Sequence, residues 1–418
     1  MAGHQSQIQR DRQRLAEAMQ RPLTGRLGTY FRLSGPGWIA SAITLGGGSL
    51  ASSLYLGVLG GYSLMWLQPL AMVMGVIMLA AIGYVTLSTG ERPFRAINEH
   101  VSPVLGWGWA LAVAAANVIW CMPQHSLAGG VLGQNLLPGL LGQDGSLSNW
   151  AHNTFGETSE FLADNADKLI VSLVILVICT VITWSYDRGG WGLRLYEIVL
   201  KIVVGIIVLC FLGVVIRLTF STQPLDWGAI FRGLVPDFGQ FWRPADTFGP
   251  LLDAIGAEGT AAREFWVAKI VAEQRDVMIS AAATAVGINM TLMFPYTMLR
   301  KGWTKEFRGL SIFDLSTGMF IPYVLATGFV VIAAASQFHT KLPVGFSEFT
   351  ASDGTVHLEI EKDSPKLADY EKLIASRDGA LNRGQPQTSE TPSASAPALP
   401  PSDAEKRLAA MESQPGGQ

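Results

Sequence analysis

The chain has 418 residues, of which 49% are hydrophobic and only 15% are charged, and its mean hydropathy is positive. This composition excludes an ordinary soluble domain and indicates a polytopic membrane protein. The net charge of −3 argues against a nucleic-acid partner. All three cysteines fall in apolar stretches, so the sequence predicts no disulfide framework.

Residues 1–34 form a polar N-terminal arm rich in arginine. The arm has no separate apolar core before the first long apolar stretch, so it is not a cleavable signal peptide. Cytoplasmic segments are enriched in Lys and Arg, and we therefore expect a cytoplasmic N-terminus. The expected location is a cell membrane, taken as the bacterial inner membrane. A short helix in the arm either lies on the anionic leaflet or is solvated.

The apolar pattern predicts about eight transmembrane spans and thus an all-α polytopic membrane protein. The spans are expected at 36–58, 62–87, 104–137, 168–186, 194–217, 247–271, 277–299 and 312–337. Loop charges alternate as the positive-inside rule requires, with one exception. The loop after the seventh span carries Arg300, Lys301, Lys305 and Arg308 but is placed outside. Either this loop is an exception or a span is miscounted.

Residues 340–418 form a polar tail after the predicted membrane domain, which occupies residues 35–339. A strand-like piece at Val356–Ile360 precedes a charged, helix-like piece. Residues 384–402 are rich in Pro, Ser, Gln and Ala and are expected to be disordered, and Glu405–Ser413 is expected to form a short helix. With eight spans, the tail is cytoplasmic.

Two of the apolar stretches are interrupted by glycine. The first is broken at Gly46, Gly47, Gly48 and Ser49, and the second at residues 256–260. Each glycine costs a helix about 1 kcal/mol relative to alanine, and an unwound turn in hydrocarbon exposes backbone groups that water cannot satisfy. Paired interruptions in two halves of a chain predict a transporter binding site near the bilayer midplane. The alternative is that the glycines only allow close helix packing.

Polar side chains at the two breaks are the main candidates for chemistry. Glu258 could bind a cation or carry a proton, or it could be a structural partner of Arg263. The hydroxyls of Ser49 and Thr260 suit a hard cation or a polar organic molecule, or they cap the half-helices. The predicted substrate site comprises Gly46, Gly47, Gly48, Ser49, Ala257, Glu258 and Thr260.

The proton pathway is predicted to use Glu258 and His125. His125 lies within the third span, and imidazole titrates near neutral pH, which suits a proton carrier. The alternative for His125 is a hydrogen-bonded interior residue. Glu258 is also the candidate metal ligand, and no cofactor is expected.

Several short motifs occur in a consistent order and spacing: Gly35-Pro36-Gly37, Ala40-Ser41, Gly61-Tyr62, Asn135-Leu136-Leu137, residues 194–201, residues 233–236 and Gly256-Ala257. Through them, residues 30–340 resemble the Nramp family of proton-coupled divalent-metal transporters. The resemblance implies a leucine-transporter-type fold of two inverted repeats, with broken first and sixth helices that form the substrate site.

The chain departs from the family pattern at the positions that handle metal and protons. The family's Asp-Pro-Gly-Asn signature aligns with residues 46–49, and its Met-Pro-His signature aligns with residues 260–262. Two acidic residues of the family's third span fall on Pro123 and Ser126. The soft thioether that favours transition metals is therefore absent. Spans nine and ten of the family are also missing, so we expect a fragment, a split gene product whose partner supplies them, or a shortened form that relies on a homodimer.

The sequence therefore predicts a secondary transporter of the symporter type, not an enzyme, with an altered substrate site. Its cargo is a metal cation or a small polar solute. The alternative is a transport-inactive membrane sensor or scaffold that signals through its tail. A polar, water-accessible cleft would favour transport, and a pocket filled by neighbouring side chains would favour the scaffold.

Overall fold

The computed structural model describes residues 2–142, 145–155, 159–187, 191–221, 224–350, 356–384 and 401–413. The chain forms two compact units. Unit one is Met1–Gly48, Gly75–Ile206 and Gly287–Pro322. Unit two is Ser49–Met74, Ile207–Val286 and Tyr323–Gln418.

Helices form nearly all of the regular structure in the described residues. The first part of the chain contains α1 Ala2–Met19, α2 Leu23–Leu33, α3 Pro36–Thr44, α4 Gly47–Gly60, α5 Leu67–Thr89, α6 Pro93–His100, α7 Pro103–Val131, η1 Leu132–Leu136, α8 Pro138–Leu141, α9 Ser146–Phe155, α10 Glu160–Asp187 and α11 Trp191–Thr219. The second part contains α12 Trp227–Arg232, η2 Phe238–Phe241, η3 Asp246–Phe248, α13 Gly249–Glu258, α14 Thr260–Ala285, α15 Met290–Arg300, η4 Lys305–Phe307, α16 Arg308–Asp314, η5 Leu315–Phe320 and α17 Ile321–Phe338. The strands β1 Phe346–Thr350 and β2 Val356–Ile360 and the helices α18 Leu367–Gly384 and α19 Asp403–Glu412 follow.

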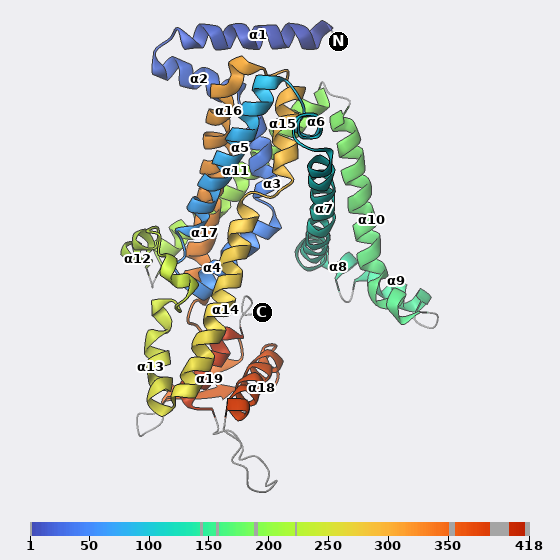
Figure 1. Cartoon of the computed structure of the whole chain (residues 1–418). Coiled ribbons are helices and arrows are strands. Elements are labelled where there is room, and N and C mark those ends of the chain that lie inside the picture. Colours follow the sequence, from blue (N-terminus) through green and yellow to red (C-terminus); the bar gives the residue numbers. More distant parts are fainter. Residues whose placement is uncertain are drawn as a thin grey trace. The chain divides into compact units, whose positions relative to one another are not determined.

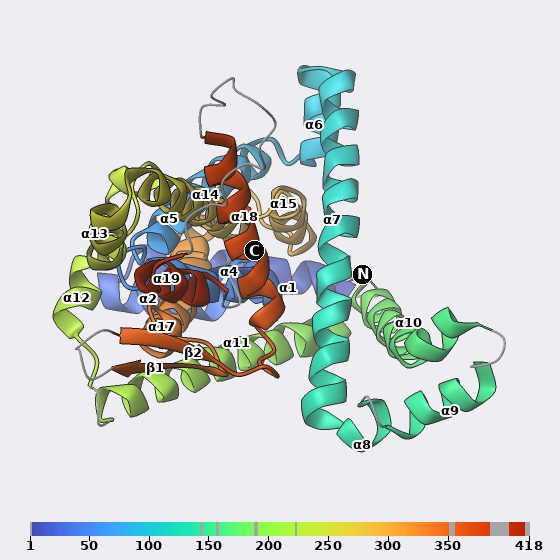
Figure 2. The same cartoon turned by 90° about the horizontal axis from the view of Figure 1, so that it is seen from below.

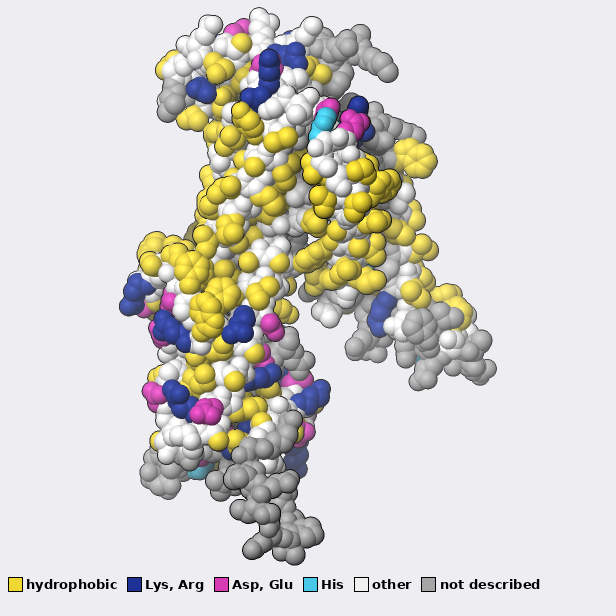
Figure 3. Space-filling view, in the orientation of Figure 1, with side chains coloured by type: hydrophobic (Ala, Val, Ile, Leu, Met, Phe, Trp, Pro, Cys, Tyr) yellow, Lys and Arg dark blue, Asp and Glu magenta, His cyan; other side chains and the backbone are white. Residues whose placement is uncertain are grey.

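Five helical segments in the described residues are long and apolar enough to cross a membrane: Leu67–Thr89, Pro103–Leu136, Ile198–Thr219, Thr260–Arg300 and Lys305–Phe338. The bent pair α3 and α4 raises the number to six if it is counted as one span. In Figure 3, the side chains over α7 are mostly hydrophobic, and charged side chains gather at its α6 end. The prediction of an all-α polytopic membrane protein is confirmed, whereas the inverted-repeat relation stays a prediction.

The helices differ from the predicted spans in one region. The sixth and seventh expected spans, 247–271 and 277–299, correspond to one membrane-length segment, Thr260–Arg300. Instead of continuing into α14, α13 folds back beside it after Gly259 (Figure 1). Gln274, in the middle of α14, accepts a hydrogen bond of 3.1 Å from the amide of Ala245, which precedes α13. The two helices therefore form an antiparallel hairpin, which an apolar pattern cannot distinguish from a broken span.

The basic loop that disagreed with the predicted topology lies beside the N-terminal arm in unit one. Arg12 Nη2 on α1 donates a hydrogen bond of 3.1 Å to Thr304 Oγ1. A Cβ atom on Gly302 would lie 2.3 Å from Ile8, so the arm touches the loop directly. If the bent pair and the shorter apolar helix Lys168–Trp184 are each counted as a span, Thr260–Arg300 is the sixth span and the loop after it falls on the same side as the arm. Counted in this way, the loop agrees with the positive-inside rule.

The C-terminal region folds onto α13 and α14 in unit two (Figure 2). β1 and β2 pair in antiparallel register, with Phe346 opposite Ile360. Apolar residues of this region join residues of α13 and α14 in one buried cluster, which includes Ile255, Trp266, Ile270, Phe346, Tyr370 and Leu408. A strand at Val356–Ile360 and a helix near Glu405–Ser413 are present, while most of the stretch expected to be disordered lies outside the described residues.

His339 joins three segments of unit two just after α17. Its Nδ1 lies 2.7 Å from the carbonyl oxygen of Val58, and its Nε2 lies 2.8 Å from Thr247 Oγ1. Because a carbonyl only accepts, Nδ1 carries the proton and Nε2 accepts from the threonine. Burial lowers the pKa of His339 below its ordinary value of 6.5, and the bond to Val58 acts in the opposite sense.

His339 should make the fold sensitive to acid. The unfolded chain binds a proton at His339 more readily than the folded chain, so stability should fall as the pH drops below about 6.5. His339→Asn keeps a donor for Val58 but does not titrate. Thermal unfolding of detergent-solubilised protein across this pH range measures the effect. An equal acid-induced loss in the wild type and in His339→Asn would contradict the assignment.

Candidate functional site

The first span is broken where the glycine run begins. α3 ends at Thr44, α4 begins at Gly47, and the two helices are bent by 56°. The amide of Leu45 still donates to the carbonyl oxygen of Ser41 at 2.8 Å, and the regular helix ends at this bond. The predicted break is therefore present, but it lies at Leu45 and Gly46, whereas Gly47, Gly48 and Ser49 form the first turn of α4. Glycine suits it because it is a poor helix interior residue and leaves space beside the backbone.

Side chains of α7 occupy the space beside these glycines. A Cβ on Gly46 would lie 3.6 Å from Gln124 Nε2, and one on Gly47 would lie 3.3 Å from Gln124 Oε1 and 2.5 Å from Leu127 Cδ1. A Cβ on Gly48 would lie 2.9 Å from Trp120. Gln124 and Leu127 remain exposed, so α7 does not seal this face within unit one. Residues 46 and 47 thus have a neutral amide as their nearest polar side-chain group from α7.

Ser49 begins a buried polar chain in unit two. It is 3% exposed, and its carbonyl oxygen accepts a hydrogen bond of 2.7 Å from Ser53 Oγ. Gln68 Nε2 on α5 donates to Ser53 Oγ at 3.0 Å, and the Tyr323 hydroxyl on α17 donates to Gln68 Oε1. Satisfied polar groups of this kind fix the packing of helices in an apolar interior. Ser49 is therefore part of the link among α4, α5 and α17.

The second break lies in the turn of the hairpin in unit two. Gly259 has extended backbone angles, φ −179° and ψ 130°, between α13 and α14. Ala257 and Thr260 are exposed on either side of it. Glu258 is the last residue of α13, and its side chain lies outside the described residues.

Arg263 crosses the hairpin turn. Its Nη2 lies 3.6 Å from Asp253 Oδ1, and a Cβ on Gly256 would lie 2.6 Å from its Cδ. Both members of this ion pair are substantially exposed, so the pair adds little stability. Arg263 thus has Asp253 as a partner, and the suggested pairing with Glu258 lies outside the described residues.

His125 bonds to its own helix. Its Nδ1 lies 2.9 Å from the carbonyl oxygen of Cys121, one turn earlier, and 3.4 Å from the sulfur of the same residue. This geometry matches the expected alternative of a hydrogen-bonded residue. A proton-carrying role for His125 stays a prediction.

A buried carboxylate that the sequence reasoning missed lies in unit one. Asp314 is 0% exposed, and its Oδ2 accepts hydrogen bonds from the amides of Gly37 at 2.7 Å and Gly35 at 3.3 Å. These amides belong to the start of α3, where a negative charge is favoured. Among the described residues, Asp314 Oδ1 has no hydrogen-bond partner. The available signal was one acidic residue within the apolar stretch 312–337.

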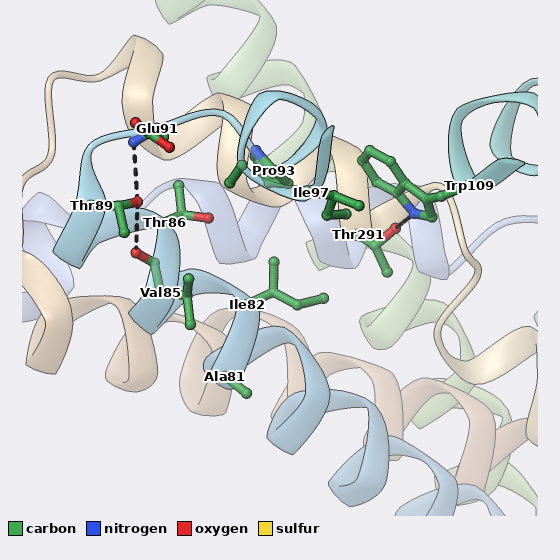
Figure 4. A pocket seen from close by; sticks show the side chains of 11 residues that line it. Ala81, Ile82, Val85, Thr86, Thr89, Glu91, Pro93, Ile97, Trp109 and Thr291 are labelled. Atoms are coloured by element: carbon green, nitrogen blue, oxygen red, sulfur yellow. Dashed lines mark hydrogen bonds between the residues drawn. The ribbon is translucent and has the colours of Figure 1, made fainter. Parts of the chain in front are cut away.

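A cavity of about 380 Å³ lies among α5, α6, α7 and α15 in unit one (Figure 4). Its lining is mostly apolar, and Trp109 Nε1 donates a hydrogen bond of 3.1 Å to Thr291 Oγ1 at one side. Glu91 at its edge forms a group with Glu99 and His100, whose ligand atoms all lie within 4.8 Å of one another. Glu91 pairs with His100, and Glu99 pairs with Arg95. These mutual pairs explain the cluster without a metal.

The fold and the broken first span define a class of protein: a helical, polytopic membrane protein with a discontinuous span. Residues 37–353 match the family model described as natural resistance-associated macrophage protein-like, or Nramp, and the chain belongs to this family. No curated protein matches the chain. The family match confirms the resemblance seen in the sequence. The members of the family are metal-ion transporters rather than enzymes.

Asp314 should be needed for the stability of unit one. Asp314→Ala leaves the amides of Gly35 and Gly37 without their acceptor, and each buried unpaired group costs about 1–3 kcal/mol. Asp314→Asn keeps one acceptor oxygen and should lose less. Thermal unfolding in detergent measures both variants. If Asp314→Ala unfolded at the same temperature as the wild type, this carboxylate would not anchor α3.

Proposed function

We propose that this Nramp protein transports a hard divalent cation such as Mg²⁺, or a small polar solute, through an altered site at the first break. The observation that carries the proposal is the position of Gln124 beside Gly46 and Gly47. An amide oxygen and backbone carbonyls are neutral, hard ligands, which suit Mg²⁺ or Ca²⁺ better than Mn²⁺ or Fe²⁺. The site proposed at the first break comprises residues 46–49, and Ala257, Glu258 and Thr260 are proposed as separate substrate contacts at the second break.

Asp314 is a proposed site for a coupled proton, together with Glu258 and His125. A carboxylate inside a membrane domain is costly and is therefore a functional candidate by default. When ionised, Asp314 accepts from two amides at the start of α3. When protonated, it accepts these bonds more weakly. Proton binding at Asp314 would thus loosen the start of the broken first span.

The second candidate function is a transport-inactive sensor or scaffold. Trp120 and Leu127 fill space beside Gly48 and Gly47, which favours a closed site. The folded C-terminal region offers a second module attached to α14. This candidate predicts a folded protein that moves no ion.

Uptake into proteoliposomes distinguishes the two candidates. We expect uptake of Mg²⁺ to exceed that of Mn²⁺, to respond to a proton gradient, and to fall about tenfold in Gln124→Leu because one polar ligand is lost. Asn117→Leu is the matched control. Asn117 lies two turns before Gln124 on α7, and its side-chain amide donates a hydrogen bond of 2.8 Å to the carbonyl oxygen of Val113 in the same helix. Glu258→Gln tests the proposed charged group at the second break.

Equal uptake by Gln124→Leu and Asn117→Leu would remove Gln124 from the site. Unchanged uptake and pH dependence in Glu258→Gln would remove Glu258. No uptake of either ion by protein shown to be folded would contradict metal transport and favour the scaffold.

We further propose that the N-terminal arm is cytoplasmic and that the C-terminal region lies on the opposite side of the membrane. The arm and the loop near Thr304 carry the basic residues and touch one another. Lys305–Phe338 is one membrane-length segment, so the chain after Phe338 leaves the bilayer on the other side. The sequence with eight spans predicted a cytoplasmic tail.

Cysteine labelling tests this orientation. In a background with Cys121, Cys179 and Cys210 replaced by Ser, we introduce Gln13→Cys or Ser376→Cys, both at exposed positions. A membrane-impermeant maleimide should label the two cysteines from opposite sides of sealed vesicles. Labelling of both from the same side would contradict the proposed topology.

A further inference from the structure

The C-terminal helix α19 is held in unit two by a buried apolar face. Leu408, Ala409 and Ala410 are fully buried, and they share a cluster with Trp266 and Ile270 of α14. Burial of this kind is the main favourable term in the association of protein segments. The polar contacts around this face decide under which conditions α19 stays in place.

One polar contact of α19 is balanced in charge. Arg377 on α18 and Glu405 on α19 are each 3% exposed and form two hydrogen bonds of 2.8 Å. Trp266 Nε1 donates to the same carboxylate at 3.2 Å. The Glu405 carboxylate thus accepts these three hydrogen bonds and faces one guanidinium, so this contact is satisfied in both hydrogen bonding and charge.

A second polar contact is unbalanced. Glu412 at the end of α19 is 2% exposed, and its carboxyl lies within hydrogen-bonding reach of Glu273 on α14. Lys269, one turn earlier on α14, forms an ion pair with Glu273. Apart from that ion pair, no donor among the described residues reaches Glu412 Oε2 or either oxygen of Glu273. Two carboxyl groups thus share a single ammonium group.

We propose that Glu412 and Glu273 share one proton and that this proton latches α19 onto α14. The protonated carboxyl of Glu412 donates to Glu273, which completes the hydrogen bonding and leaves one negative charge for Lys269. When the proton leaves to solvent, two carboxylates face one another in a buried site, and α19 is repelled from α14.

The direction of the pH effect follows from the docked geometry. Burial is the main cause that raises the pKa of Glu412 well above its usual range, the neighbouring Glu273 raises it further, and Lys269 acts in the opposite sense. The docked state therefore holds the proton more tightly than the released state. Docking is strongest at low pH and weakens as the pH rises through the raised pKa.

Other charged groups face α19 from the strands and from α18. His357 on β2 lies 3.0 Å from Asp403, and Glu348 on β1 lies 2.6 Å from Arg407. Lys406 pairs with Asp403, and Asp378 pairs with Arg377. The contact between His357 and Asp403 is an ion pair only when His357 is protonated. Its contribution needs a separate control.

Amide hydrogen exchange of residues 403–412 in the full chain tests the latch, with protection factors measured from acid to alkaline pH. In the wild type, protection should fall by up to about tenfold per pH unit between the ordinary pKa of a free glutamate and the raised pKa of docked Glu412, and it should level off above that, as expected for one proton. Glu412→Gln should stay protected at high pH, because its amide donates to Glu273 at every pH. His357→Gln should keep the wild-type slope.

Two further variants make the test decisive. Glu273→Gln removes one of the two carboxyl groups from α14, so it should also abolish the dependence of the protection factor on pH. It provides a test even if Glu412→Gln does not fold. Glu405→Gln weakens the balanced pair and should lower protection at every pH without changing the slope. A flat wild-type profile, or a wild-type slope retained in both Glu412→Gln and Glu273→Gln, would overturn the proposal.

Discussion

The contact between Asp314 and the start of α3 is the interaction on which the first broken span depends. A Cβ on Gly37 would lie 2.3 Å from the Asp314 carbonyl oxygen, so only glycine permits this approach. The carboxylate then accepts the amides of Gly35 and Gly37, which have no partner within their own helix. With α3 fixed at its start, the bend at its end places Gly46–Gly48 beside α7. The Gly35-Pro36-Gly37 motif therefore has a structural cause.

Glycine also occurs at the first break, where it makes room for side chains instead of backbone. Gly37 admits a backbone, whereas Gly47 and Gly48 admit the side chains of Leu127 and Trp120. A larger residue at either break position would displace α7 or be displaced by it. The glycines at the break and the α7 side chains that fill the space beside them thus belong to one packing arrangement. The proposed change of cargo is centred on Gln124 because it is the polar α7 side chain beside Gly46 and Gly47.

Local chemistry made several features predictable from the sequence. The glycine run at 46–48 predicted the first break because glycine is a poor helix former, although the regular helix resumes at Gly47. The last helix was expected at Glu405–Ser413 and begins at Asp403, where Ser402 and Glu405 form a capping box. The family was identified from short motifs in order, and its model matches residues 37–353.

Features that depend on contacts between residues far apart in the chain could not be predicted from the sequence. The hairpin of α13 and α14 depends on Gln274 reaching residues 240–245, and no local pattern reveals that contact. Trp266 and Glu405 are 139 residues apart, so the docking of α19 was equally invisible. Asp314 was visible as an acid in an apolar stretch, but its partners at Gly35 and Gly37 were not.

A disulfide cross-link tests most directly whether α7 fills the first break. Gly47→Cys and Leu127→Cys would be combined in a background with Cys121, Cys179 and Cys210 replaced by Ser. Because a Cβ on Gly47 would lie 2.5 Å from Leu127 Cδ1, we expect this pair to cross-link readily under mild oxidation in membranes. Gly47→Cys with Ile119→Cys, on another face of α7, should not cross-link. Failure of the first pair, or equal cross-linking of both, would contradict the account.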